Sequence, residues 1–87
     1  MNLNPEDMKP VILRMKRANG HLASVIKMLE DGADCEAVLT QLAAVNKALS
    51  RSGYAIVATG LRQCLSQGDG FGDADAQKME KLFLTLA

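Results

Sequence analysis

The feature that most constrains the fold is residues 34–67, where apolar or small side chains recur at alternating steps of three and four. This stretch contains no proline, and its only acidic residue after Asp34 is Glu36. The recurring positions are Cys35, Val38, Leu42, Val45, Leu49, Ser52, Ile56 and Thr59. Such spacing is typical of a long helix that packs against other helices. We therefore expect one continuous helix.

This expected helix contains both cysteines of the chain, Cys35 and Cys64. A helix rises about 1.5 Å per residue, so the two sulfur atoms would lie roughly 44 Å apart within one chain. An intrachain disulfide needs Cα atoms within about 7 Å of each other. If the helix is continuous, its cysteines can meet only between two chains. An antiparallel pairing centred between Leu49 and Ser50 would bring Cys35 beside Cys64 of the partner subunit.

The chain is short, and its apolar residues are mostly aliphatic. Its 87 residues, 1–87, allow one domain, and a domain of this size often depends on oligomerisation for stability. Hydrophobic residues make up 48% of the sequence, yet it has no Trp, one Tyr and two Phe. Such a chain fills its interior with Leu, Val, Ile, Met and Ala, as helical bundles do.

A second long helix is expected before residue 31. Asn4 is suited to the N-cap and Pro5 to the first helical position. Gly32 is suited to the position just past the helix end, and Asp34 can cap the next helix. The apolar stripe again alternates steps of three and four: Met8, Val11, Met15, Ala18, Leu22, Val25 and Leu29.

A short third helix is expected after the glycine-rich residues 68–72, with Asp73 as its cap. Its apolar face would consist of Ala76, Met79, Leu82, Phe83 and Leu86. The fold class is therefore all-α, with three helices per chain and the first two long and antiparallel. Two such helices make half of a four-helix bundle, so we expect an antiparallel dimer that completes the bundle.

Two glycines lie in the later half of the long helix, where each costs up to about 1 kcal/mol relative to Ala. Gly53 and Gly60 share a face with Val57 and Cys64. Close approach by another backbone and room around Cys64 both explain this arrangement, and spacing alone does not choose between them.

The charged residues are segregated although the formal net charge is zero. Residues 8–29 and 37–68 contain basic residues and no acid, while the acids gather at the ends of the expected helices. Such helices can present a positive surface to a partner such as nucleic acid. The alternative is a solvated surface, with acids at helix N-termini for electrostatic reasons. Both interpretations stay open at this point.

No arrangement of residues indicates catalysis, so we do not expect an enzyme. His21, the only histidine, is expected opposite the apolar stripe of the first helix, on the same face as Arg14 and Arg17, at a surface or interface position. There is no CxxC motif for zinc. With no secretory signal and no apolar run long enough for a membrane, we expect a cytoplasmic protein. Disulfides are rare there, so the two cysteines indicate metal binding, redox sensing or plain packing.

The run LRMKRANGHLASVIKMLEDGADCEAVLTQLAAVNKAL, within residues 8–65, resembles the CsoR-type family of bacterial metal-sensing and stress-sensing repressors. The family signature R-x-x-R-x-x-G-Q matches at Arg14, Arg17 and Gly20, while His21 replaces the usual Gln. Cys35 is followed by V-L-T-Q-L at 38–42, as in the family. The resemblance implies all-helical dimers that pair into tetramers, bind operator DNA and release it when an inducer binds.

The resemblance also implies a sensing site. Copper sensors of the family hold Cu(I) with a cysteine, a histidine 25 positions later and a second cysteine four further on. Cys35 and Cys64 match the two thiols, but Gly60 stands at the histidine position. Asp34 stands where those sensors have a tyrosine, and Glu80 matches the glutamate of the last helix.

A branch of this family that keeps both cysteines and loses the histidine is the CstR group of persulfide sensors. Its thiols are modified by reactive sulfur species and become bridged across the dimer. The resemblance thus favours a repressor that senses persulfide or polysulfide through Cys35 and Cys64, without a metal cofactor. Two alternatives stay open: a Cu(I)-responsive repressor that uses the same two thiolates, and a helical interaction module whose cysteines are inert.

For operator DNA, the resemblance adds Arg51 to the two arginines of the first helix. The expected DNA-binding residues are Arg14, Arg17 and Arg51, with Lys16 and Lys47 as weaker candidates. Arginine suits both phosphate groups and the edge of guanine.

Overall fold

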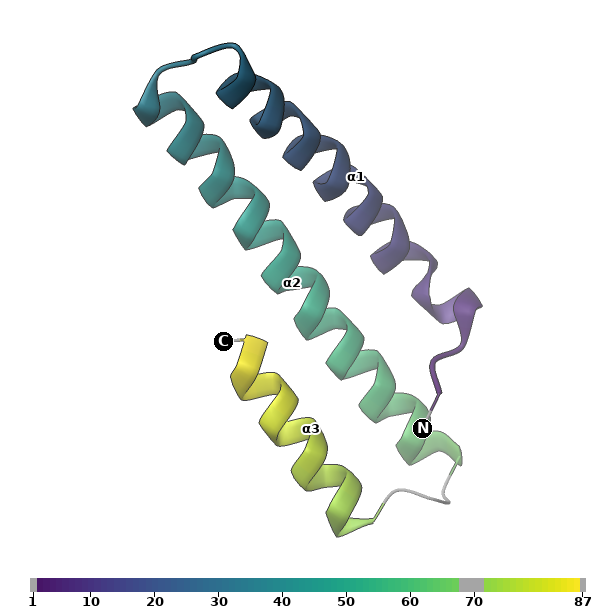
Figure 1. The fold of residues 1–87 in the computed structure, drawn as a ribbon. Helices are drawn as coiled ribbons and strands as arrows, with labels where there is room; N and C mark the ends of the chain where they lie inside the picture. Colours follow the sequence, from purple (N-terminus) through teal and green to yellow (C-terminus); the bar gives the residue numbers. More distant parts are fainter. Residues whose placement is uncertain (1, 68–71, 87) are drawn as a thin grey trace.

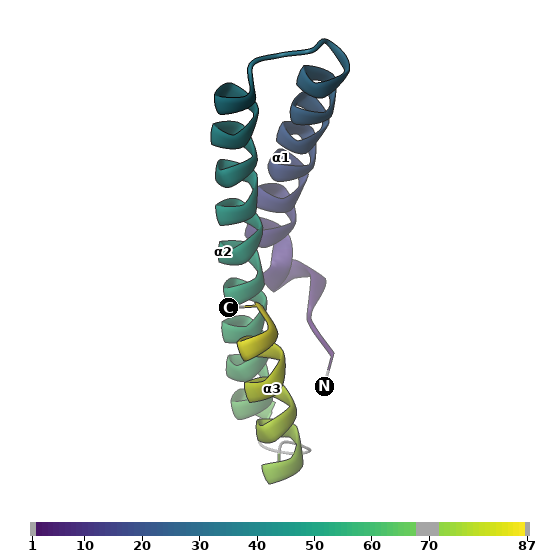
Figure 2. The ribbon, with the colours of Figure 1, turned by 60° about the vertical axis from the view of Figure 1, so that its left-hand side comes forward.

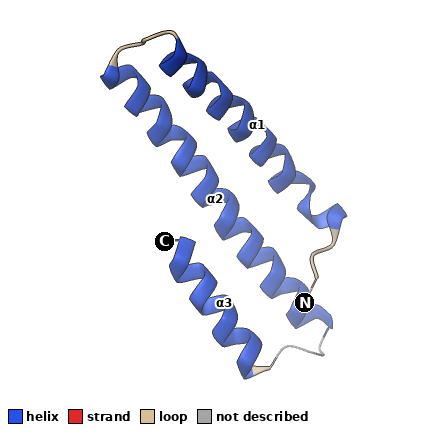
Figure 3. Cartoon of the chain, in the orientation of Figure 1, coloured by secondary structure: helices blue, strands red, loops and turns tan. Residues whose placement is uncertain are grey.

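The computed structural model describes residues 2–67 and 72–86, except for the side chains of 63–67 and 73. The described residues form three helices and no strand: α1 (Pro5–Glu30), α2 (Cys35–Gln67) and α3 (Asp73–Leu86) (Figures 1 and 3). The expected all-α class and the continuity of the long helix are confirmed. None of the three helices, over the residues described, combines the length and apolar character that a membrane span requires.

Helix α1 begins as the sequence predicts. The Asn4 side chain accepts a hydrogen bond from the Glu6 backbone N–H at 2.9 Å, and Pro5 takes the first helical position. Glu6 also pairs with Lys9 at 3.0 Å. Pro10 lies early in α1, and the helix continues through it to Glu30. This local chemistry fixes the helix start without help from the rest of the fold.

The turn between α1 and α2 reverses the chain with hydrogen bonds that satisfy both helix ends. Gly32 adopts a φ of 71°, and the Ala33 backbone N–H donates to the Met28 carbonyl at 2.9 Å. Asp34 then caps α2, because its carboxylate accepts from the Ala37 N–H at 3.2 Å. These are the Schellman and N-cap arrangements expected of a Gly and an Asp in these positions. Helices α1 and α2 therefore run antiparallel (Figure 1).

The interface between α1 and α2 is built from small aliphatic side chains. Val25, Val38 and Val45 form its buried centre, with Met28 and Leu42 packed against them. Burial continues along both helices at roughly one position per two turns: Met8, Val11 and Ala18 on α1, and Ser52 and Thr59 on α2. Each helix thus uses only part of its apolar stripe against the other.

Helix α3 packs along the later half of α2, where the rings of Tyr54 and Phe83 lie 5.2 Å apart. A Cβ atom added at Gly53 would lie 2.9 Å from Leu86 Cδ1. The close approach predicted at the glycines therefore occurs, but the neighbour is a side chain rather than another backbone. Asp73 is the first residue of α3 instead of its cap, and the Gly72 carbonyl accepts the Ala76 N–H at 3.0 Å.

The three helices form a flat layer with α2 between α1 and α3 (Figures 1 and 2). The chain measures 53 × 25 × 14 Å, and among the described residues α3 contacts α2 but not α1. A helix with its side chains is about 10–12 Å across, so the layer is one helix thick. Because stable domains bury apolar surface between at least two layers, a single layer leaves apolar faces uncovered.

The uncovered face contains the other half of the predicted stripes. Met15, Leu22 and Leu29 of α1 are 41%, 36% and 63% exposed, and Leu49 of α2 is 40% exposed. Part of this face is a shallow groove of about 400 Å³, which we call the apolar groove, lined by Ile12, Met15, Lys16, Ala18, Asn19, Leu22 and Leu49. The sequence pattern predicted that each stripe forms one continuous packing surface. In the structure, part of each stripe lies in the contact between α1 and α2, and the rest lies on an open surface.

Candidate functional site

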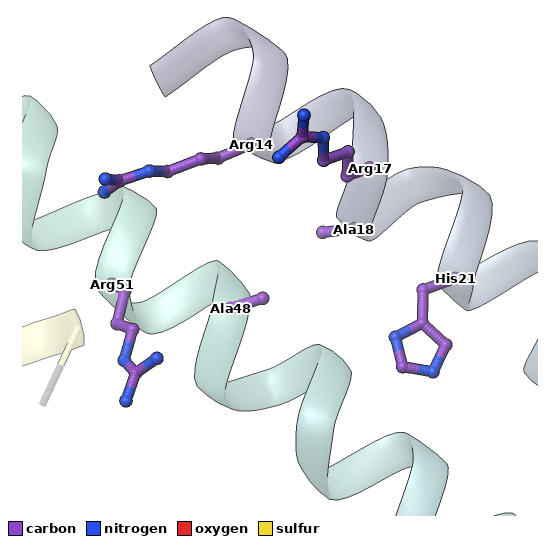
Figure 4. A pocket seen from close by; sticks show the side chains of 6 residues that line it. All are labelled: Arg14, Arg17, Ala18, His21, Ala48 and Arg51. Atoms are coloured by element: carbon purple, nitrogen blue, oxygen red, sulfur yellow. The ribbon is translucent and has the colours of Figure 1, made fainter. Parts of the chain in front are cut away.

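Three arginines gather on the side of the α1–α2 pair shown in Figure 4. They lie in a groove of about 530 Å³ that we call the arginine groove, lined by Arg14, Arg17, Ala18, His21, Ala48 and Arg51. Arg14 extends from α1 towards α2, and the ring of His21 is turned the same way (Figure 4). The structure thus brings together the three arginines that were expected to bind DNA.

The position of this groove follows from helix geometry. Residues 14, 18 and 21 are separated by steps of four and three, so they share one face of α1. Ala18 is buried against α2, which places Arg14 and His21 beside the apolar stripe. The expectation that Arg14 and His21 lie opposite the stripe is therefore wrong. Alanine at 18 and 48 leaves space between the helices for the longer side chains.

The arginines of this groove have no acidic partner among the described residues. The two ion pairs found in that part of the chain are Lys9–Glu6 and Lys27–Asp31, both at exposed positions of α1 and its end. The guanidinium groups of Arg14, Arg17 and Arg51 therefore remain free to bind an anion. A planar guanidinium matches the geometry of a phosphate group better than lysine does.

His21 connects the two helices at the edge of the arginine groove. Its Nε2 lies 2.6 Å from Oε1 of Gln41 on α2, and the residue is half-buried. Sequence reasoning did not identify Gln41. A signal for it existed, because residues equally distant from the Asp31–Gly32 turn face each other in an antiparallel pair.

The two lysine candidates are not part of this groove. Lys16 lines the apolar groove beside Met15 and Leu22, on another side of α1. Lys47 is exposed and lines neither the arginine groove nor the apolar groove. The five predicted DNA-binding residues thus separate into a cluster of three arginines and two isolated lysines.

Cys35 is the first residue of α2 and is exposed. The neighbouring Asp34 uses its carboxylate to cap the helix, and Glu36 lies on the other side. Cys64 belongs to the last turns of α2, and its side chain lies outside the described part of the structure. Because α2 is continuous between the two residues, they are roughly 44 Å apart in one chain.

Gly60, which stands at the ligand position of the copper sensors, is buried beneath other side chains. A Cβ atom there would lie 3.4 Å from Leu3 Cδ2 and 3.7 Å from Met79 Cε. A larger residue could enter only if those two flexible side chains moved. Among the described residues, no group of three His, Cys, Asp or Glu side chains is placed to hold a metal ion.

Comparison with known proteins identifies the family. The model of the metal-sensitive transcriptional repressor family matches residues 7–87, nearly the whole chain. The chain belongs to this family. Membership places the chain among transcriptional repressors, which are not a class of enzymes. It also agrees with the resemblance that the sequence motifs indicated.

Curated relatives of this chain carry a more specific name. The chain is similar to the copper-sensing transcriptional repressor CsoR of Mycobacterium ulcerans, with 41% identity over 63 residues, 70% of this chain and 54% of the relative. It is 34% identical over 68 residues to proteins of that name from Mycobacterium bovis and Mycobacterium tuberculosis, covering 76% of this chain and 57% of each relative. The chain thus spans only about half the length of these relatives. No solved structure matches it.

Proposed function

We propose that this protein is an operator-binding repressor that releases DNA when an inducer joins Cys35 to Cys64 of the partner subunit. The observation that carries the proposal is the unbroken helix α2 from Cys35 to Gln67. It holds the two cysteines of one chain too far apart to share a ligand or a bond. Family membership supplies the repressor function, which would operate in the cytoplasm, where the operator is.

The proposed assembly is an antiparallel dimer that pairs further into a tetramer. It is supported by the one-helix thickness of the chain and by the open face that contains Met15, Leu22 and Leu49. A second copy laid on this face would add the missing layer and complete a four-helix bundle from α1 and α2 of both chains. Dimerisation also creates the sensing sites, because each one needs a cysteine from each subunit.

The proposed DNA contact is the arginine groove. Its support is the clustering of Arg14, Arg17 and Arg51 without acidic partners in the described structure. Lys16 and Lys47 would add long-range attraction rather than direct contacts, because they lie outside the groove. A dimer carries two such grooves, so both can contact the same duplex.

The names of the relatives favour Cu(I) as the inducer over reactive sulfur. The chemistry of the donors fits, because soft thiolates select Cu(I) and Cys35 is exposed at a helix start. Bound Cu(I) would link the thiolates of two subunits. Cys35 and Cys64 would hold it, and this chain offers no histidine at position 60 as a third ligand.

The residue at position 60 favours the second candidate inducer, a persulfide or polysulfide. Gly60 removes the third metal ligand but leaves both thiols, which is all that sulfur chemistry requires. The Cys35 thiolate would attack the outer sulfur of a persulfide RSSH, forming Cys35–SSH and releasing RS⁻. The thiolate of Cys64 of the partner subunit would then attack Sγ of Cys35, forming a disulfide between the two Sγ atoms and expelling the outer sulfur of the persulfide as HS⁻.

One experiment separates these functions. DNA binding is measured by fluorescence anisotropy while Cu(I) buffered by a chelator, or a polysulfide donor under metal-free conditions, is added. Release by one reagent and not by the other identifies the inducer, and mass spectrometry shows whether sulfur was added to the thiols. Gly60→His, which restores the third ligand, should strengthen Cu(I) binding and leave the polysulfide response intact. If the protein binds no DNA even when both reagents are absent, it is the helical interaction module instead.

A further inference from the structure

The hydrogen bond between His21 and Gln41 has a consequence for the arginine groove. The acceptor is the side-chain oxygen Oε1 of Gln41, 2.6 Å from Nε2 of His21, so the ring donates its proton from Nε2. The other ring nitrogen, Nδ1, has no hydrogen-bond partner within the described residues. A neutral imidazole held this way presents a lone pair at Nδ1.

The charge state of the ring then decides what Nδ1 can bind. In the neutral ring its lone pair repels a phosphate oxygen. In the protonated ring Nδ1 carries a proton and donates to that oxygen, while Nε2 keeps its bond to Gln41. From this geometry we propose that His21 is a fourth phosphate-binding residue of the arginine groove, and that it contacts DNA only when protonated.

The inference rests on the proposed DNA-binding role of the groove. The charged groups that face His21 are Arg14 and Arg17 on α1 and Arg51 on α2, and the neighbouring Gln41 is uncharged. Arginine stays charged throughout the range in which histidine changes its charge. The three arginines therefore give a constant contribution to DNA binding, and His21 adds one that depends on pH. Since phosphate oxygens favour the imidazolium, proton uptake accompanies binding.

His21→Gln is the matched variant, because glutamine is uncharged at any pH and is the usual residue of the family signature at this position. His21 is also the only histidine in the sequence, so no other imidazole contributes. A second variant, Gln41→Ala, frees Nε2 and lets the neutral ring carry its proton on either nitrogen. The neutral ring can then donate to phosphate, which weakens the dependence on pH without removing the histidine.

The test measures binding to a duplex selected by the wild-type protein from a random-sequence pool. Affinities are compared at pH 6.0 and 7.5, at constant ionic strength with a thiol reductant. We expect wild-type binding to be roughly fivefold tighter at pH 6.0, because the step in pH converts only part of the imidazole, with a salt slope larger by up to about 0.9, the value for one full phosphate contact. His21→Gln should bind equally at both pH values, and Gln41→Ala should show an intermediate ratio.

Two outcomes separate this inference from the function on which it rests. If His21→Gln keeps the wild-type ratio between the two pH values while Arg14→Ala weakens binding, the histidine contact is wrong and the arginine groove remains the DNA-binding site. If Arg14→Ala and Arg51→Ala both bind as tightly as wild type, the groove itself is not the interface. A wild-type affinity that is equal at the two pH values also overturns the histidine contact.

Discussion

At the scale of single residues, the arginines of the groove should dominate DNA binding. Replacing Arg14 or Arg51 by Ala removes a guanidinium that has no acidic partner in the described structure. We expect each variant to bind operator DNA roughly tenfold more weakly, because one charge-assisted contact is lost. The slope of log affinity against log salt should fall by about 0.9 per contact. Fluorescence anisotropy at several salt concentrations measures both quantities.

The matched control is Lys27→Ala, which removes one positive charge outside the groove. Lys27 lies near the end of α1 and pairs with Asp31 at 3.3 Å. Its loss should leave the slope nearly unchanged. Equal effects of Lys27→Ala and Arg14→Ala would mean that only overall charge matters.

The candidate residues were predicted unevenly, and the reason is physical. Arg14, Arg17 and Arg51 were identified from acid-free basic segments and the family signature, and the structure brings them together. Arg14 and His21 were wrongly predicted to lie opposite the apolar stripe, because the spacing of apolar residues does not show how narrow the contact with α2 is. The contact between His21 and Gln41 depends on the pairing of two helices, which no local pattern records.

At the scale of the helices, the glycines of α1 and α2 have different surroundings. A Cβ at Gly20 would meet nothing within 4 Å, whereas one at Gly53 would lie 2.9 Å from Leu86 Cδ1. Gly20→Ala should raise the free energy of unfolding by about 0.5–1 kcal/mol through helix propensity alone. Gly53→Ala should raise the free energy of unfolding by less, because the Leu86 side chain must move to make room for the added methyl group. Urea unfolding at a fixed protein concentration provides the comparison.

The result for Gly20→Ala also reports on the assembly. A loss of stability there would show that another subunit approaches this face of α1 closely enough to exclude a methyl group. In that case the open space seen around Gly20 would belong to an interface.

Helix boundaries were the most predictable feature of the fold. Asn4, Gly32 and Asp34 act through hydrogen bonds within a few residues, so their roles can be inferred from the sequence. The start of α3 was misplaced by one residue, because Asp73 follows a glycine whose carbonyl begins the helix. The packing of α3 on α2 through Tyr54 and Phe83 is a tertiary contact, which spacing within either helix does not specify.

At the scale of the whole molecule, the open apolar face should be the dimer interface. Leu49 lines the apolar groove and is 40% exposed in the single chain. Leu49→Glu would bury an unpaired carboxylate in the dimer, at a cost of roughly 3 kcal/mol or more. The dissociation constant of the dimer should therefore rise at least about 100-fold, which analytical ultracentrifugation can measure.

Leu84→Glu is the control for this prediction. Leu84 is 64% exposed on α3 and lines neither described groove of the α1–α2 pair. The Leu84→Glu substitution should leave the dissociation constant of the dimer unchanged. A wild-type protein that sediments as a folded monomer at micromolar concentration would contradict both the bundle and the pairing of cysteines between chains.

In the proposed assembly, each sensing site combines Cys35 of one subunit with Cys64 of the other. Its most direct test mixes two inactive variants, Cys35→Ser and Cys64→Ser, unfolds them together and refolds them as mixed dimers. Neither variant alone can form a bridged site. A mixed dimer regains one intact site of its two, so random mixing should restore about a quarter of the wild-type sites.

The measured quantity is the inducer-dependent link between subunits, detected as a covalent dimer on non-reducing gels with polysulfide or as Cu(I) bound per dimer in a chelator competition. We expect the mixture to recover this signal and the separate variants to show none. A mixture that stays as inactive as its components would show that the two cysteines do not act across the dimer.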